Sequence, residues 1–398
     1  IRDRLRSRGL GDVYKRQTFI MLSCSEDKYS ACRVNIRLLA PEGYSDFPLE
    51  KMTVTLASRS HGAIYQSACS SDGVASFEVE CGYYTVSAHY QTPAGLIFSG
   101  RIESLALLSE VDEKTKTVEL PLLRSETSAL VIKEIYYAGC IGRQGEEYQA
   151  DQYVTIYNNS EEVLYLDGLC VAVVDPAGSN ESPWMKYTGM DKIPVNDLAW
   201  QFPGRGRDHP LYPGAETTIA TNAVDHTGGD YLHANSVDLS GVDFGFWDVS
   251  LSRQDIQAGV VPMKLISRLN PNTSLYSFPL VGPAFMIFSL QTASALEYVE
   301  NPQNRKPRPQ AANQNKMYLV IPKEWVIDCV ECVESLERIT VKRVPDGLNH
   351  TPAFIPEGAY SGKSLVRKKT VDANGRVIYQ DTNNASQDFE VTTPLLKK

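Results

Sequence analysis

The sequence predicts a mainly β protein of two β-sandwich modules, the second carrying a long insertion that contains some helix. Apolar and polar residues alternate, as they do in half-buried strands, in three runs of the first module: Val34–Leu38, Met52–Leu56 and Val74–Val79. A continuous β-prone run, Ala129–Tyr137, opens the second module. With 398 residues, of which 42% are hydrophobic, the chain is long enough for at least two separate cores.

The overall composition narrows the classes of function. A net charge of −9 argues against broad binding to nucleic acid, so no nucleic-acid partner is expected. No apolar run reaches the roughly 18 residues that a membrane-spanning helix requires. The sequence also lacks the G-x-S-x-G, H-E-x-x-H and P-loop motifs. No catalytic residue is therefore assigned, and a non-enzymatic protein is expected.

The first segment, Ile1–Gln17, is rich in arginine and resembles a translated sequencing adapter. It is excluded from the fold prediction for that reason. The alternative interpretation is a basic arm that binds nucleic acid or membrane.

Residues 18–31 are interpreted as a truncated lipoprotein signal and tether. An apolar stub, Thr18–Leu22, leads into Leu22–Ser23–Cys24, which resembles a bacterial lipobox with Cys24 as the lipidated residue. The acidic stretch Ser25–Lys28 resembles the surface-export signal of Bacteroidota lipoproteins. These resemblances imply a lipid anchor in the outer membrane and exposure at the cell surface. The alternatives are a buried strand cysteine at position 24 and a solvated linker after it.

Residues 32–124 are predicted to form the first module. An Asp-Gly turn, Ser71–Gly73, separates two of its strands, and the run Gly82–Ala88 adds another. Strand, Asp-Gly turn, strand and Gly-Tyr-Tyr-x-Val, in that order, resemble the carboxypeptidase-regulatory-like and related Ig-like modules of surface proteins. The resemblance implies a β-sandwich that serves as a spacer or binding module without catalysis.

Residues 125–398 are predicted to form the second module. Four segments resemble the opening strands and the closing segment of the lamin-tail domain, an Ig-like sandwich: Ala129–Tyr137, Asp151–Ser160, Val163–Val173 and Asp381–Phe389. Thr155 stands where that family usually has Glu. The match is longer than a minimal lamin-tail domain, so an insertion at about 225–350 is expected to decorate the sandwich. The whole arrangement resembles an uncharacterised family of Bacteroidota outer-membrane lipoproteins, which implies no particular activity.

One histidine-containing stretch offers a candidate metal site. Asp225, His226, Asp230 and His233 could together supply carboxylate and imidazole ligands to a divalent metal ion. The alternative is a polar surface loop, and no other cofactor is predicted. Three histidines are scattered along the chain and receive no role: His61, His89 and His350.

Six cysteines are candidates for disulfide bonds in an exported protein: Cys69, Cys81, Cys140, Cys170, Cys329 and Cys332. Cys69 and Cys81 flank one predicted strand. Cys329 and Cys332 form a C-x-x-C motif, but the sequence has no second such motif and no adjacent βαβ pattern. A local disulfide or two packed thiols are therefore favoured over redox catalysis.

Together these features predict a surface-exposed outer-membrane lipoprotein that acts as a non-enzymatic binding or accessory module. The lipoprotein class suggests an outer-membrane β-barrel receptor as its partner, in nutrient uptake. The alternative is a metal-binding or metal-acquisition lipoprotein that uses the His226 and His233 region. Tyr136, Tyr137, Tyr153 and Tyr157 could form a stacking face for sugar or peptide, or lie in the core.

Overall fold

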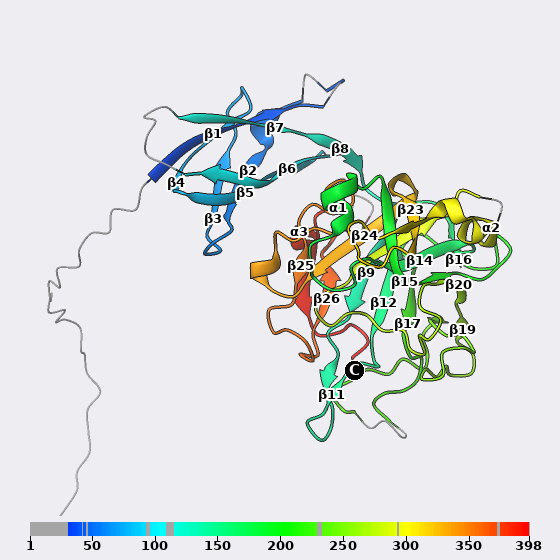
Figure 1. The fold of residues 1–398 in the computed structure, drawn as a ribbon. Coiled ribbons are helices and arrows are strands. Elements are labelled where there is room, and N and C mark those ends of the chain that lie inside the picture. The colour runs from blue at the N-terminus through cyan, green and yellow to red at the C-terminus, as the bar shows by residue number, and fades with distance from the viewer. Residues whose placement is uncertain are drawn as a thin grey trace, which may run out of the picture.

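The computed structural model describes residues 31–41, 43–44, 47–92, 96–108, 115–228, 233–292, 294–371 and 375–397. It confirms a mainly β protein with a β-sandwich architecture. Figure 1 shows strands β1–β8 grouped together beside a larger body formed by the rest of the chain. No helix of the described residues is long and apolar enough to cross a membrane.

The N-terminal part, residues 31–126, consists of two sheets around one core. One sheet has the order β4 (Val74–Glu80), β1 (Ala31–Leu39) and β7 (Lys116–Pro121), with β1 antiparallel to β4 and parallel to β7. The other has the order β3 (Ile64–Ala68), β2 (Thr53–Ser58), β5 (Gly82–Gln91), β6 (Leu96–Leu107) and β8 (Leu123–Glu126). A 3-10 turn, η1 (Leu49–Lys51), precedes β2.

The alternating pattern predicted for these strands places every second side chain in the core. Val34 and Ile36 of β1 and Val54 and Leu56 of β2 are fully buried in the same cluster. Their polar neighbours along the strands face outward. The outer face of β2 and β5 carries small polar side chains and, as described below, borders the C-terminal part.

The C-terminal part, residues 127–397, is a sandwich of two large sheets. The seven-stranded sheet has the order β19 (Val261–Pro262), β18 (Phe244–Gly245), β17 (Glu216–Ala220), β12 (Tyr153–Asn158), β9 (Leu130–Tyr136), β26 (Ser364–Arg367) and β29 (Phe389–Thr392). The second sheet has the order β22 (Arg305–Pro307), β23 (Met317–Pro322), β15 (Lys192–Gln201), β14 (Leu169–Val174), β21 (Ala284–Ser289), β24 (Val326–Val333) and β25 (Ala353–Phe354), with β20 (Lys264–Arg268) also paired to β15.

The two large sheets enclose the main core, to which Ile132 and Val154 contribute from one sheet and Val171 and Phe285 from the other. A second cluster covers the opposite face of the eight-stranded sheet, where α1 (Pro183–Thr188) and α2 (Ala295–Glu300) contribute Trp184 and other side chains. Both faces of β14 and β21 are therefore buried, which explains their continuous apolar sequences.

The expectation that residues 225–350 decorate the sandwich is wrong. This segment supplies β18, β19, β20, β21, β22, β23 and β24, and β21 and β24 pair with each other inside the eight-stranded sheet. Cross-strand hydrogen bonds connect β21 directly to β14, so the segment completes the core. Within this segment a single 3-10 turn, η3 (Lys323–Trp325), leads directly into β24.

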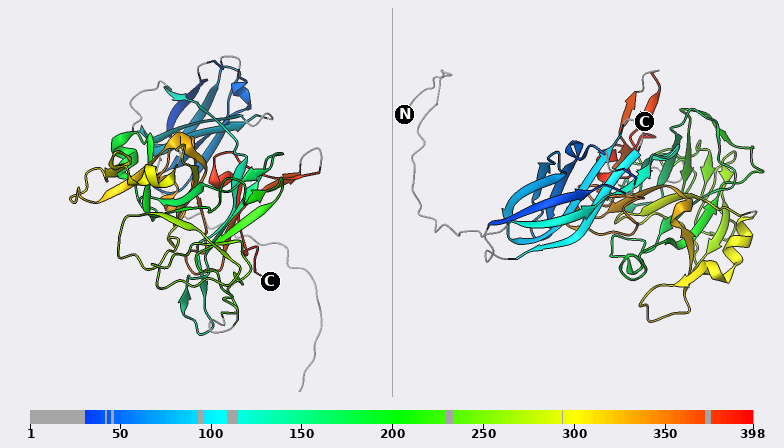
Figure 2. Two further views of the ribbon diagram at one scale, coloured as in Figure 1. Left: turned by 90° about the vertical axis from the view of Figure 1, so that its right-hand side faces the viewer. Right: turned by 90° about the horizontal axis from the view of Figure 1, so that it is seen from above.

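Short elements complete the structure. Three two-stranded pairs lie outside the main sheets: β10 (Cys140–Ile141) with β11 (Glu147–Tyr148), β13 (Leu164–Tyr165) with β16 (Pro210–Leu211), and β27 (Lys369–Val371) with β28 (Val377–Tyr379). The β27–β28 pair projects from the body in both views of Figure 2. The remaining elements are η2 (Pro302–Asn304), η4 (Leu336–Arg338) and α3 (Ala385–Asp388).

Candidate binding site

Two neighbouring hollows lie where the N-terminal sheets meet the C-terminal sandwich. The larger, here called the junction groove, has a volume of about 840 Å³. The smaller, here called the His350 cavity, has a volume of about 400 Å³. His89 of β5 and Gln387 of α3 line both hollows. The two parts of the chain therefore form one continuous candidate binding region.

Uncharged hydrogen-bonding groups dominate the lining of the junction groove. They come from the N-terminal part, from the connection into β9, from the residues after β12, and from the β27–β28 pair and the segment after it: Tyr90, Thr92, Thr127, Ser128, Asn159, Ser160, Thr370, Tyr379, Gln380, Thr382 and Gln387. Among the described residues of this lining, Asp381 is the single carboxylate, and its Oδ2 accepts a hydrogen bond from the Ser128 backbone N–H at 2.6 Å. The described lining thus offers neutral hydrogen-bonding groups, and its one carboxylate is already bonded within the protein.

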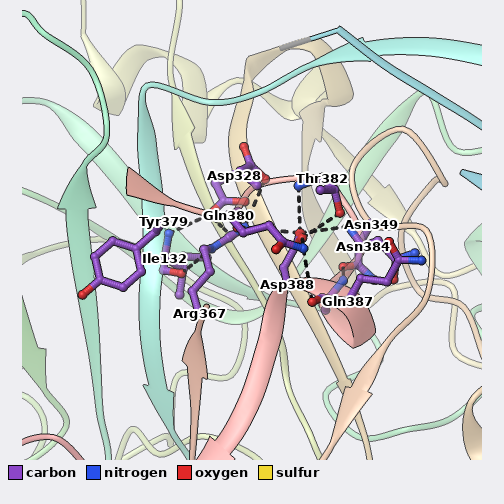
Figure 3. Close-up of polar contacts among 12 residues, drawn as sticks. Ile132, Asp328, Asn349, Arg367, Tyr379, Gln380, Thr382, Asn384, Gln387 and Asp388 are labelled. Carbon is purple, nitrogen blue, oxygen red and sulfur yellow. Dashed lines mark hydrogen bonds and ion pairs between the residues drawn. The ribbon is translucent and has the colours of Figure 1, made fainter. Parts of the chain in front are cut away.

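A buried ionic network supports the floor of the groove (Figure 3). The Arg367 side chain of β26 is 2% exposed and donates to five acceptors: the backbone oxygens of Ile132 and Gln380 and the carboxylates of Asp328, Asp381 and Asp388. Its Nη2 lies 2.7 Å from Asp328 Oδ2, and its Nη1 lies 3.1 Å from Asp381 Oδ1. One guanidinium therefore connects β9, β24 and the segment 380–388, which are distant in the sequence.

Burial opposes the ionisation of two of these carboxylates. Burial raises the pKa of Asp328 to about 6, although Arg367 acts in the opposite direction. Burial likewise raises the pKa of Asp388, again against the effect of Arg367. The Arg367 pKa is raised because its three carboxylate neighbours outweigh the cost of its own burial. The network is a structural support, since all four ionised side chains are 2% exposed or less.

The segment Asp381–Phe389 forms this support because its polar side chains bond to its own backbone. Asp388 accepts hydrogen bonds from the backbone N–H groups of Thr382 at 2.9 Å and Asn384 at 3.2 Å, and from the Thr382 hydroxyl at 2.6 Å. This bonding orders the turn into α3 and points Thr382 and Gln387 toward the groove. The sequence showed the segment as a family-like motif and did not reveal that its aspartates pair with Arg367.

The His350 cavity is bordered by a loop that a second buried network holds in place. Lys342 and Arg343 both pair with Glu331 of β24, at 2.9 Å and 3.3 Å, and all three side chains are nearly or fully buried. Lys342 Nζ also donates to the backbone oxygen of Asn349, the residue before His350. The network therefore reaches from β24 to the main chain beside the His350 ring.

A second hydrogen bond fixes the same peptide group. The backbone N–H of His350 donates to the backbone oxygen of Asn383 at 2.5 Å. The Asn349 oxygen and the His350 N–H belong to one peptide unit, so both of its polar groups are bonded. The main chain of His350 is therefore held independently of its side chain.

Two histidines that sequence reasoning left without a role meet at this junction. The rings of His89 and His350 lie 6.3 Å apart between centroids, although 261 positions separate the residues. His89 Nε2 contacts the Thr382 backbone oxygen at 2.6 Å, so this nitrogen carries the proton and donates it. Burial lowers the pKa of His89, an effect that its bond to Thr382 partly opposes. No local pattern could have revealed this pairing, because the two residues belong to different parts of the fold.

The structure brings His226 and His233 together but uses them differently from metal ligands. Both nitrogens of the buried His226 ring are engaged, Nδ1 by the Tyr148 hydroxyl at 2.6 Å and Nε2 by the Asn222 oxygen at 2.9 Å. The Tyr148 ring also packs on His233 at 3.9 Å between centroids. Asp225 bonds to the following Thr227.

Asp230, the fourth candidate ligand, lies outside the described residues. Among the residues that are described, no three or more His, Cys, Asp and Glu side chains are grouped to hold a metal ion. The described members of the candidate site instead fix a loop through hydrogen bonds and ring packing.

The disulfide candidates need a larger correction. Cys81 bonds to Cys32, which is not one of the six candidates, and the bond joins the start of β1 to the residue before β5. The other five candidates are buried free thiols: Cys69, Cys140, Cys170, Cys329 and Cys332. The C-x-x-C pair cannot form a local contact because three positions along a strand place Cys329 and Cys332 on opposite faces of β24, in different clusters.

Two further expectations concern Cys24 and a group of four tyrosines. Cys24, the expected lipidation site, lies outside the described residues. Tyr136, Tyr137, Tyr153 and Tyr157 are at most 4% exposed, so they belong to the core and form no stacking face.

Comparisons with known proteins find similarity to proteins without an assigned activity. Residues 212–395 match the family model described as "Protein of unknown function (DUF4876)". A crystal structure of a DUF4876 family protein from Bacteroides thetaiotaomicron is 25% identical, with a TM-score of 0.62, over 92% of this chain and 97% of that one. These two matches support an uncharacterised Bacteroidota family.

Other comparisons add little. A candidate adhesin from Bacteroides ovatus is 13% identical, with a TM-score of 0.22, over 50% of this chain and 72% of that one. No curated protein matches the chain.

Proposed function

We propose that this chain is a non-enzymatic binding protein, held at the outer-membrane surface by a lipid on Cys24, that acts as an accessory to a β-barrel transporter in nutrient uptake. The junction groove is the observation that carries the proposal. Its volume of about 840 Å³ is large enough for a small ligand or for a loop of a partner protein.

The chemistry of the groove favours binding over catalysis. Catalysis by acid and base requires titratable groups that can exchange protons with a substrate. Here Asp381 is committed to Arg367 and to the Ser128 backbone, and His89 Nε2 donates to Thr382. The hydroxyl and amide groups that remain suit the recognition of a polar surface.

The expected tether suits this role. Cys24 precedes β1 by seven residues. A fully extended chain of seven residues spans at most about 25 Å. A lipid at Cys24 would therefore keep the N-terminal sheets near the membrane, within reach of the extracellular loops of a barrel.

A pull-down from solubilised outer membranes of the source bacterium tests the partner. The lipidated chain serves as bait, and we expect a β-barrel protein at stoichiometric amounts that survives a salt wash. Recovery of the chain alone would overturn the accessory role. In parallel, Cys24→Ser should abolish labelling with a palmitate analogue, and Ser25→Ala should retain it.

A pair of variants on one strand tests whether the groove is the contact. Thr370 of β27 lines the groove, and Val371, the next residue, is 65% exposed and lies outside the lining. Thr370→Arg should prevent recovery of the barrel, and Val371→Arg should leave it unchanged. Equal recovery with both variants would show that the partner binds elsewhere.

A further inference from the structure

The imidazole of His350 is buried without a hydrogen-bond partner among the described residues. The residue is 1% exposed, and neither Nδ1 nor Nε2 makes a hydrogen bond to that part of the chain. The carboxylate oxygen Asp346 Oδ2 lies 4.0 Å from Nδ1, beyond hydrogen-bond distance. A buried polar group without a partner lowers the stability of the folded state, so such a group calls for an explanation.

The ring borders a cavity of a distinctive composition. Hydroxyl and amide side chains from both parts of the chain surround it, among them Thr53, Thr55, Thr340, Thr351, Ser386 and Gln387. The lining that the described residues form contains no carboxylate, and it includes the apolar side chains of Ile64, Leu336, Ile339 and Phe354. Arg101 also lines the cavity and has interactions of its own. A ligand here meets neutral hydrogen-bonding groups beside substantial apolar surface.

The protonation state of His350 restricts the class of ligand that the cavity can bind. Burial, reinforced by the nearby cations Arg101 and Lys342, holds the pKa of His350 well below its usual value. The ring is therefore neutral at pH 7 and presents one N–H donor and one bare nitrogen acceptor. A purely anionic group would satisfy only the donor, and an apolar ligand would satisfy neither. A hydroxyl group can both donate and accept.

We infer that the His350 cavity binds a neutral sugar unit, whose hydroxyl groups bond to the His350 ring and to the surrounding threonine, serine and amide side chains. This inference deepens the proposed binding function by naming a ligand class. The volume of about 400 Å³ falls within the range of about 300–1,000 Å³ for small-molecule sites. It also exceeds by about tenfold the roughly 30 Å³ that one water molecule occupies in the liquid.

The loop that carries His350 is prepared for such a ligand. The Lys342–Glu331–Arg343 network and the hydrogen bond from Ala385 N–H to Asn349 Oδ1 at 3.0 Å hold the loop beside the ring. A ligand then loses little free energy in ordering the site, which favours binding. The ring keeps its hydrogen-bonding capacity because the backbone contacts carry the structural role.

Ligand binding by the purified full chain tests this inference without any membrane or partner, so its failure is separable from failure of the pull-down. The probes are D-glucose, D-galactose, D-mannose and N-acetyl-D-glucosamine, with maltose and cellobiose as disaccharides and D-glucuronate as the charged comparison. Saturation-transfer NMR followed by calorimetry should show saturable binding of at least one neutral sugar. Absence of binding by every neutral probe, or a preference for D-glucuronate over D-glucose, would overturn the inference.

Matched variants locate the binding. His350→Leu and Thr351→Val, both in the cavity, should each weaken sugar binding at least tenfold. His209→Leu and Thr117→Val lie outside the lining and should bind as the wild type does. Binding that survives both cavity variants would refute the assignment.

Stability separates a ligand-binding role from a structural one. His350→Leu removes a ring that makes no hydrogen bond to the described residues, so its thermal midpoint should equal or exceed that of the wild type. A large loss of stability in this variant would mean that the ring is a structural element and would contradict the inference.

Discussion

Replacing Arg367 with methionine removes the cation that three buried carboxylates share. The side chain is 2% exposed and donates to Asp328, Asp381 and Asp388 and to two backbone oxygens. Methionine retains much of the aliphatic volume but leaves the carboxylates without compensation. Breaking a buried pair in this way typically costs about 3–5 kcal/mol, so we expect a loss of that size in the free energy of unfolding.

The loss should depend on pH in a definite direction. The folded-state pKa of Asp328 is about 6, above its unfolded value, so ionisation of this group lowers stability as the pH rises between the two. Without Arg367 the folded-state pKa values of Asp328 and Asp388 rise further, and the loss of stability with rising pH extends to higher pH. The cost of Arg367→Met should therefore be smaller at pH 5 than at pH 8.

Urea unfolding, followed by circular dichroism at both pH values, measures this cost. Arg33→Met is the control, because Arg33 pairs with Glu78 at 3.2 Å on the surface, where such a pair contributes at most about 1 kcal/mol. Arg367→Lys retains the charge and provides a milder variant if the methionine variant fails to fold. A cost of less than about 1 kcal/mol at pH 8, or an equal cost at the two pH values, would refute the reasoning.

Three further outcomes follow from the buried groups. Because the His350 pKa is lowered in the folded state, wild-type stability should fall relative to His350→Leu as the pH drops below about 6.5, by at most about 1.4 kcal/mol per pH unit; parallel pH profiles in urea unfolding would contradict this. Loss of the Cys32–Cys81 bond in the double serine variant should cost about 2–4 kcal/mol, and an unchanged unfolding midpoint would show that the bond contributes nothing. The double variant His226→Ala, His233→Ala should leave the metal content unchanged by mass spectrometry, since the structure engages both nitrogens of His226 in hydrogen bonds; a loss of bound metal would restore the metal-binding alternative.

The local sequence pattern determined the strands of this protein. In β1 and β2 apolar and polar residues alternate because each strand buries one face and exposes the other. The sequence of each strand therefore indicates which side chains are buried. In β14 and β21 the continuous apolar runs equally predict strands, because both faces are covered. These signals depend on residues a few positions apart, which is why one sequence was enough to predict a mainly β fold.

Only the tertiary structure decided which of these strands pair and which polar groups meet. Segment 225–350 enters the eight-stranded sheet because β21 pairs with β14 and β24, a choice that packing across the core determines. Cys81 bonds to Cys32 across 49 positions, and His89 approaches His350 only where the two parts of the chain touch. Such contacts join residues that share no local pattern. The packing of whole sheets decides which residues meet, and their spacing along the chain does not.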